Sequence, residues 1–313
     1  MLGLIVRRVL ATVPVVGVVA LIVFSLLHFS PGDPAAIIAG DLATTEDVEK
    51  IRAKLGLDEP LPVQFARWTW RLVHGDLGNS IFSNLPVTRL IAQRVEPTLV
   101  LTLTTTCWVV LTAIPMGVLA AWRAGTWIDR AVMAFAVLGF SFPSFVIGYV
   151  LIFAVAVQLE LLPVQGYAPL SQGAVPFLRS IVLPSATLGL VYTALVARMT
   201  RASMIEILGQ DYMRTARAKG VAPRRLLLLH GLKNAAVPIV TTLGAGVALL
   251  IGGVVVTESV FGIPGLGRLT VDAIVRRDYP VIQGVILVFA AAYVMINLVV
   301  DLIYVLVDPR IRY

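Results

Sequence analysis

Charge is scarce in this chain of 313 residues: only 14% of them are Asp, Glu, Lys or Arg, whereas 58% are hydrophobic. In ordinary soluble domains about a quarter of the residues are charged and about half are apolar. Water therefore cannot be the solvent for most of this surface. The formal net charge of +7 does not indicate nucleic acid, because the basic residues cluster in short segments between apolar runs.

Residues for catalysis or metal binding are equally scarce. The single cysteine, Cys107, excludes an internal disulfide and a cysteine-cluster metal site. The histidines His28, His74 and His230 are far apart in the sequence, which argues against a shared metal site. No Gly-x-x-x-x-Gly-Lys-Ser/Thr, Gly-x-Ser-x-Gly or His-Glu-x-x-His motif occurs. We therefore predict no catalytic residue, no metal ligand and no cofactor in this chain.

Long uncharged stretches are what the sequence has instead. About 20 residues suffice to cross a hydrocarbon core, and only helices or closed barrels satisfy their backbone groups in lipid. Runs without period-2 alternation predict helices, so we expect an all-α polytopic membrane protein with six transmembrane helices. The six stretches are Val9–Phe29, Pro97–Trp122, Ala131–Leu159, Ser180–Ala197, Asn234–Thr257 and Tyr279–Val300.

The distribution of Lys and Arg predicts the orientation. With the N-terminus in the cytoplasm, the inner segments hold most of the basic residues, including a cluster from Arg198 to Lys233. Such an excess is typical of cytoplasmic loops. Both termini are therefore expected inside. The first stretch is longer than the apolar part of a signal peptide and has no cleavage pattern, so it is expected to be retained.

Charges beside the spans bear on ion coupling. Asp301, Glu160 and Glu258 stand near span ends, and no charged pair lies in the middle of a span. Intramembrane charges often mark ion pathways. Their absence from the span centres weakens a proton- or sodium-coupled interpretation.

Two polar segments interrupt the apolar pattern. The first, Ser30–Glu96, predicts a small subdomain with a helix over Glu46–Leu55, which Thr44 or Thr45 caps and Gly56 ends. The second, Arg198–Lys233, has eight basic residues against Glu206 and Asp211. In it Ile205, Leu208, Tyr212 and Ala216 recur at helical spacing, followed by a stop at Gly220 and Pro223. Such a helix could lie on anionic lipid or present a knob to a partner, and periodicity favours neither.

The second segment carries specific residues. Asp211-Tyr212-Met213-Arg214-Thr215-Ala216-Arg217-Ala218-Lys219-Gly220, followed by His230-Gly231-Leu232-Lys233-Asn234-Ala235, closely resembles the cytoplasmic loop of bacterial dipeptide/oligopeptide/nickel ABC permeases. Other stretches look like the same family. They are Pro31-Gly32-Asp33-Pro34, Leu55-Gly56-Leu57-Asp58, Gly75-Asp76-Leu77-Gly78, Pro264-Gly265-Leu266-Gly267-Arg268, Arg277-Asp278-Tyr279-Pro280 and the ending Asp308-Pro309-Arg310-Ile311-Arg312-Tyr313. The resemblance covers nearly the whole chain.

The resemblance implies a type I ABC importer permease fold and a coupling helix that seats in a cytoplasmic ATPase subunit. The broader importer pattern has Glu-Ala-Ala where this chain has Arg214-Thr215-Ala216, a variant common in the peptide branch. The departure leaves open which side chain makes the main contact. The expected coupling residues are Asp211, Tyr212, Arg214, Thr215, Ala216, Arg217, Lys219 and Gly220.

The resemblance also implies partners. They are a homologous second permease, two ATPase subunits that hold ATP and Mg, and an extracytoplasmic solute-binding protein, all at the bacterial inner membrane. The expected parts of the chain are an N-terminus with the first helix (1–29), an extracytoplasmic subdomain (30–96), a five-helix core (97–307) with the coupling segment 198–233, and a cytoplasmic tail (308–313).

The leading hypothesis is thus an ABC importer permease subunit for dipeptides, oligopeptides or glutathione, with ATP hydrolysis in other subunits. Nickel-chelate import by the same architecture is an alternative. Rivals from other classes are an ion-coupled secondary transporter or channel, and a membrane-anchored assembly or sensor protein. The substrate-contacting residues are unknown at this level, because selectivity in such systems is set largely by the solute-binding protein.

Overall fold

The computed structural model describes residues 2–29, 33–39 and 44–307, so the expected tail 308–313 and the Pro31-Gly32 pair lie outside the described residues. The described part of the chain is helical and contains no strand; its one isolated β-bridge joins Asn79 and Pro86. Helices are the expected outcome, because long apolar segments in lipid satisfy their backbone groups only within the segment. The chain divides into two compact units, which are described separately.

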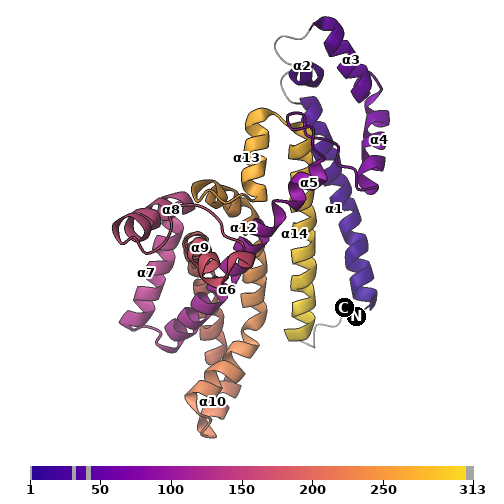
Figure 1. Cartoon of the computed structure of the whole chain (residues 1–313). Helices are drawn as coiled ribbons and strands as arrows, with labels where there is room; N and C mark the ends of the chain where they lie inside the picture. The colour runs from indigo at the N-terminus through magenta and orange to yellow at the C-terminus, as the bar shows by residue number, and fades with distance from the viewer. Residues whose placement is uncertain (1, 30–32, 40–43, 308–313) are drawn as a thin grey trace. The chain divides into compact units, whose positions relative to one another are not determined.

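The first unit comprises the residues up to Val95 together with Leu269–Val294. Its helices are α1 (Leu2–Phe29), α2 (Pro34–Ala39), α3 (Thr45–Leu55), α4 (Leu61–Val73), α5 (Val87–Ala92), most of α13 (Leu266–Arg276) and the first half of α14 (Tyr279–Val307). The predicted helix Glu46–Leu55 is α3. It ends at Gly56, whose φ of +69° is a conformation that glycine adopts without strain. Helix α4 packs on α1 (Figure 1).

A buried carboxylate fixes the loop before α5 in this unit. Asp278 precedes α14 and is only 4% exposed. It accepts a hydrogen bond of 2.5 Å from the Ser80 hydroxyl and one of 3.2 Å from the backbone N–H of Ile81. The polar segment between the first two spans is therefore tied to the turn that precedes the last one.

The second unit comprises Glu96–Arg268 and the chain from Met295 onward. Its described residues include two π-helical stretches, η1 and η3, and one short 3₁₀ turn, η2. In chain order its elements are α6 (Val95–Trp122), α7 (Trp127–Ser141), α8 (Ser144–Leu151), η1 (Ile152–Gln158), η2 (Leu170–Gln172), α9 (Ala174–Leu208), α10 (Asp211–Ala218), α11 (Pro223–Arg225), η3 (Leu226–Leu232), α12 (Ala236–Val260) and the end of α14.

Small side chains bring the helices of the second unit close together. A Cβ on Gly117 of α6 would lie 2.7 Å from the Ala197 carbonyl oxygen, and one on Gly139 of α7 would lie 2.8 Å from the Ala194 Cβ. Close backbone approach at small residues is the usual way in which membrane helices pack. Both α6 and α7 are therefore held against α9.

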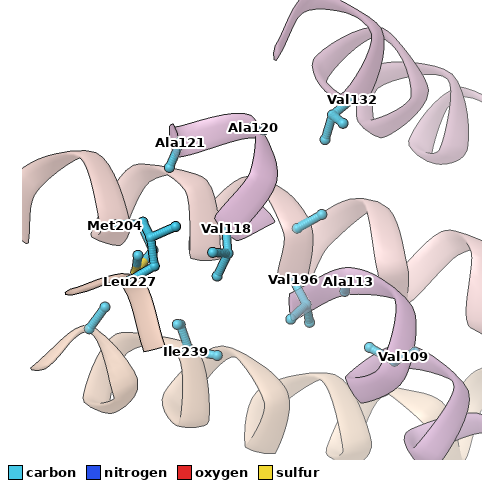
Figure 2. Close-up of a cluster of buried hydrophobic side chains, with 12 residues drawn as sticks. Val109, Ala113, Val118, Ala120, Ala121, Val132, Val196, Met204, Leu227 and Ile239 are labelled. Atoms are coloured by element: carbon cyan, nitrogen blue, oxygen red, sulfur yellow. The ribbon is translucent and has the colours of Figure 1, made fainter. Parts of the chain in front are cut away.

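An apolar cluster continues this packing towards the predicted coupling segment. It joins residues of α6, α7, α9, η3 and α12, and Figure 2 shows Val118, Met204 and Leu227 gathered from three of these elements. The members are Val109, Ala113, Val118, Ala120, Ala121, Val132, Val196, Ala197, Met204, Leu227, Ala235 and Ile239. Because interiors are close-packed, displacement of one of these helices strains the others.

Helices occupy all six predicted span positions, but not all of them meet a length-and-hydropathy criterion. Four described helices are long and apolar enough to cross a membrane, and the α7–α8 pair gives a fifth if it is one span. The described apolar part of α1, Thr12–Leu27, is shorter. The six-span count therefore stays a prediction, whereas the polytopic, all-helical character is confirmed.

Two spans differ from their predicted form. The third, expected as one helix, bends by 105° between α7 and α8. Pro143 lacks a backbone donor, and Phe142 before it is extended (φ −107°, ψ 132°), as residues before proline tend to be. The fourth, expected to be the shortest, lies within the 35-residue helix α9. The charges at Arg179 and Arg198 marked the edge of the apolar stretch rather than the ends of the helix.

Candidate functional site

The predicted coupling segment forms a separate short helix. Helix α9 ends at Leu208, Gln210 is extended (φ −71°, ψ 149°), and α10 runs over Asp211–Ala218. The prediction that Ile205, Leu208, Tyr212 and Ala216 share one helix is wrong on this point. The break at Gly209 and Gln210 puts the first two residues on α9 and the last two on α10. Figure 1 shows α10 beyond the ends of α9 and α12.

One side chain anchors α10. Met213 is fully buried, and Ala216, one turn further on, is half-buried. Tyr212, which the periodicity placed on the apolar face, is 44% exposed. The other predicted coupling residues are also exposed: Asp211, Arg214, Thr215, Arg217, Lys219 and Gly220. The inner face of α10 is therefore narrow, and most of its side chains are available to another molecule.

The end of α10 is fixed by its backbone. Gly220 has a φ of +77°, its N–H donates to the Arg217 carbonyl at 3.0 Å, and the Val221 N–H donates to the Ala216 carbonyl at 3.2 Å. This pair of bonds is a Schellman motif, which glycine suits because the left-handed conformation costs it little. The predicted stop at Gly220 and Pro223 is thus present, and Pro223 starts α11. Backbone hydrogen bonds therefore hold the turn between α10 and α11 in place.

Helix α10 also has a contact with a neighbouring element. It touches η3, the π-helical stretch that leads towards α12. Gly231 of η3 leaves room for Met204 of α9, because a Cβ there would lie 2.9 Å from the Met204 Cε. The segment that carries α10 is consequently packed on α9 at one end and continues towards α12 at the other.

The exposed charge around α10 is mostly basic. Asp211 and Arg214 form an exposed ion pair at 3.4 Å, which contributes little stability at such a position. Further exposed basic residues on the segment are Arg217, Lys219, Arg224 and Arg225. A short, capped helix with this surface can dock into a complementary groove, and steering by its charge would favour an acidic one.

The sequence did not predict an ion pair that joins α9, the helix before α10, to the start of α7. Both carboxylate oxygens of Asp129, at the start of α7, accept from the guanidinium of Arg201 on α9; the Nη2–Oδ2 distance is 2.8 Å. The backbone N–H of Gly125 also donates to Asp129 Oδ2, at 2.9 Å. The Asp129 side chain is 6% exposed and that of Arg201 26%. The turn between α6 and α7 is therefore locked to α9.

A buried carboxylate was also missed, at the other end of α12. The sequence predicts only that Glu258 stands near the end of a span. It is fully buried, accepts from the Thr98 hydroxyl at 2.5 Å, and accepts from the backbone N–H of Arg268 at 3.0 Å. The Thr98 hydroxyl in turn accepts from the N–H of Leu266 at 2.8 Å. A carboxylate at the start of a helix is favoured, since the first N–H groups of α13 lack partners within it.

The glycines of the Pro264–Arg268 motif make room for that carboxylate. A Cβ on Gly265 would overlap the Glu258 carboxyl group, and one on Gly267 would lie 3.0 Å from Glu258 Oε2. Spacing alone gave no signal for this contact, because Thr98 is 160 residues from Glu258. A glycine-rich turn close after an acidic residue is the only local hint.

The loop before α9 closes beside the same turn. Gln165 Nε2 donates to the Val260 carbonyl at 3.1 Å, and the Tyr167 hydroxyl donates to Glu96 at 3.1 Å. Burial, together with the hydrogen bond to Glu96, raises the pKa of Tyr167 to about 12. The phenol therefore remains a protonated donor at every physiological pH.

Among the described residues, no group of three or more His, Cys, Asp or Glu side chains could hold a metal ion. The predicted coupling residues lie together on one short helix, whereas Asp129, Arg201 and Glu258 lie on elements that the prediction did not include. Long apolar helices, together with an exposed and capped short helix, define a class among the described residues: a polytopic helical membrane protein with a helix that another molecule can reach.

A solved structure shares this fold. The fold is similar to a chain of the inward-facing MetNI methionine ABC transporter, with a TM-score of 0.58 and 21% identity over 70% of this chain and 96% of the other. The protein belongs to the family described as "Binding-protein-dependent transport system inner membrane component". That family matches residues 113–313, and the corresponding N-terminal family matches residues 1–102.

Relatives agree over the whole length. A "Probable peptide ABC transporter permease protein" of Sinorhizobium fredii is 52% identical over 309 residues, 99% of each chain. A "Glutathione transport system permease protein" of Escherichia coli strain K12 is 45% identical over 313 residues, 100% of each chain. The predicted family and the type I ABC importer fold are confirmed. The chain is an ABC transporter permease, a membrane subunit rather than an enzyme.

Proposed function

We propose that this chain forms half of the translocation pathway of an ATP-driven importer for short peptides, with dipeptides, oligopeptides and glutathione as the substrate class. The observation that carries the proposal is α10, which buries Met213 and leaves most of its other side chains exposed. The full-length identity to permeases named for peptide and glutathione transport supports the substrate class.

The proposed complex also contains a homologous second permease, two ATPase subunits with ATP and Mg, and an extracytoplasmic solute-binding protein. Both termini and α10 then lie in the cytoplasm, and the chain resides in the bacterial inner membrane. The coupling residues are Asp211, Tyr212, Arg214, Thr215, Ala216, Arg217, Lys219 and Gly220. The proposed parts of the chain are the N-terminus with the first helix (1–29), the extracytoplasmic subdomain (30–96), the five-helix core (97–307) and the cytoplasmic tail (308–313).

In this mechanism, ATP binding closes the ATPase pair and carries α10 with it. A floppy loop would absorb that movement, whereas the hydrogen bonds at Gly220 and the buried Met213 keep α10 a rigid body. Because α9 is packed against α6 and α7 and paired through Asp129, the motion would pass into the membrane helices. ATP and substrate must bind the two access states with different affinities for such coupling to work.

The test is uptake by the complete complex in proteoliposomes, after coexpression with the proteins encoded beside it. We expect an ATPase to copurify, and uptake of a labelled dipeptide or of glutathione to require ATP, Mg and the solute-binding protein. Uptake without ATP, driven by a proton or sodium gradient, would contradict the proposal in favour of an ion-coupled transporter. The same assay with a nickel chelate in place of the peptide tests the alternative substrate: uptake of the chelate and not of the peptide would favour nickel import.

A further inference from the structure

Helix α4 of the first unit has an unusual arrangement of faces. Its 13 residues form three stripes. The first stripe holds the aromatic residues Phe65 and Trp68, and the second, beside it, holds the polar residues Gln64, Arg67 and Arg71. The third stripe, on the opposite side, is apolar and holds Val63, Ala66, Trp70 and Val73. Residues three or four positions apart share a face of a helix, so these are three stripes along its length. No residue of α4 is fully buried.

The first stripe fixes the depth of α4. Phe24 of α1 stacks edge-on against Phe65 with ring centroids 5.3 Å apart, and Trp68 lies 5.8 Å from the same ring. Phe24 belongs to the apolar stretch Val9–Phe29 that the sequence predicts as the first membrane span, close to its outer end. Aromatic side chains concentrate at this boundary between hydrocarbon and water. With that predicted span in the membrane, α4 lies at the level of the lipid headgroups.

A cavity of about 130 Å³ lies beside the second stripe. Its walls come from α1, the turn after α3, α4, the loop before α5 and the start of α14. Most of the wall is apolar, with Leu27, Leu57 and Ile81 among its residues, and Glu59, Gln64 and Gln283 add polar groups. Cavities whose walls are mostly apolar can accept small hydrocarbon groups, and the polar groups here leave the apolar part of the wall in one place with the arginines. The walls suit a portion of an acyl chain.

Two arginines line the same cavity and differ in their partners. Arg67 is paired with Glu59 at 2.7 Å. Arg71 forms no ion pair or side-chain hydrogen bond with any residue that the structure describes, and it is exposed. An unpaired guanidinium at the headgroup level is suited to a phosphate group.

The third stripe is an exposed apolar face on the other side of α4. Trp70 is 68% and Val73 75% exposed, so the described residues of the first unit leave most of this apolar face open. The His74 ring packs on the Trp70 ring, with centroids 4.3 Å apart. Helix α1 has exposed apolar side chains of the same kind, such as Leu21 and Ile22. An amphipathic helix with this composition lies in the membrane interface.

We propose that α4 is an interfacial helix of the outer leaflet and that the cavity beside it binds one phospholipid. The acyl chain enters between Leu27, Leu57 and Trp68, and the phosphate is held by Arg71. The ligand class is a membrane phospholipid, and the site is separate from the coupling segment.

Native mass spectrometry of the complete transporter with defined phospholipids tests the site. Arg71→Gln is expected to lower the retained phospholipid roughly fivefold, because a basic residue at the surface contributes about that factor. Leu57→Trp, which fills the cavity, should remove it. Arg89→Gln is the matched control, since Arg89 is an exposed arginine on α5 that does not line the cavity. Equal retention by all three variants would overturn the proposal.

A second measurement separates the possible occupants. In a Cys107→Ser chain, Leu57→Cys should react with a water-soluble maleimide more slowly when phospholipid is supplied. Displacement of the lipid by excess inorganic phosphate would show that only an anion is recognised, and would overturn the lipid assignment. Protection by the solute-binding protein alone, with no effect of lipid, would overturn it in favour of a protein contact.

Discussion

Two turn regions of the second unit, Asp211–Pro223 after α9 and Glu258–Arg268 at the end of α12, have similar sequences but differ in the structure. Each combines glycine, proline and charged residues, and each carries residues typical of the family. At the second turn the charge is buried: Glu258 is fully enclosed and accepts from Thr98 and Arg268. At the first, Asp211, Arg214 and Arg217 are all exposed.

The difference separates structural from functional charge. A buried carboxylate with its hydrogen bonds made inside the chain stabilises the fold and has no capacity left for a partner. Exposed charges on a capped helix contribute little to stability, since such pairs are worth at most about 1 kcal/mol. The α10 side chains are therefore the ones available for another subunit. Changes at the two turns should affect different measurements.

The largest effect on stability is expected from Glu258→Ala. The Thr98 hydroxyl and the Arg268 N–H would lose a buried acceptor, and the free energy of unfolding should fall by about 3 to 5 kcal/mol. Thermal melting in detergent measures this change. Glu206→Ala, at an exposed glutamate of α9, should change stability by less than about 0.5 kcal/mol. Equal effects of the two variants would remove the contrast between the turns.

Asp129→Asn should have the next largest effect. It leaves the Arg201 guanidinium without its counter-charge, and we expect a loss of about 2 to 3 kcal/mol, below that of a fully buried pair because Arg201 is partly exposed. Arg201→Lys keeps the charge but loses the two parallel hydrogen bonds, so its loss should be smaller. Chemical denaturation of both variants gives the comparison; a larger loss for Arg201→Lys would contradict the ion pair's assigned role.

Gly220→Ala should cost about 1 kcal/mol, because φ is +77° there and a Cβ disfavours that conformation. The cost is one of backbone conformation, since a Cβ at Gly220 would meet no atom within 4 Å. Gly209→Ala is the control on the other side of α10: with φ −80° it should have no destabilising effect. If both glycines tolerate alanine equally, the cap at the end of α10 does not hold it.

The sequence predicted the helical class, the helix at each of the six positions, the stop at Gly220 and Pro223, and the family. These follow from local properties: apolar length, missing charge and turn residues. It did not predict the bend before Pro143 or the continuation of α9 past Arg198. A proline within an apolar run bends one helix and is tolerated in another, as Pro184 inside α9 shows, because neighbouring helices decide the outcome.

The two missed polar contacts have the same cause. Asp129 and Arg201 are 72 residues apart, and Thr98 and Glu258 are 160 apart. Only the packing of α6, α7, α9 and α12 brings them together. The prediction for the buried face of α10 is wrong for a different reason. The periodicity assumes one continuous helix from Ile205 to Ala216, whereas the chain breaks at Gly209, and the buried residue is Met213 instead of Tyr212.

Cross-linking on α10 tests most directly whether its exposed face binds the ATPase subunit. In a Cys107→Ser complex, cysteine is placed either at exposed Thr215 or at buried Met213, and a short bis-maleimide is added. We predict that Thr215→Cys cross-links to the ATPase subunit with an efficiency that changes with ATP, and that Met213→Cys does not cross-link. Equal cross-linking from both positions, or none from Thr215 in a complex that transports peptide, would contradict the account.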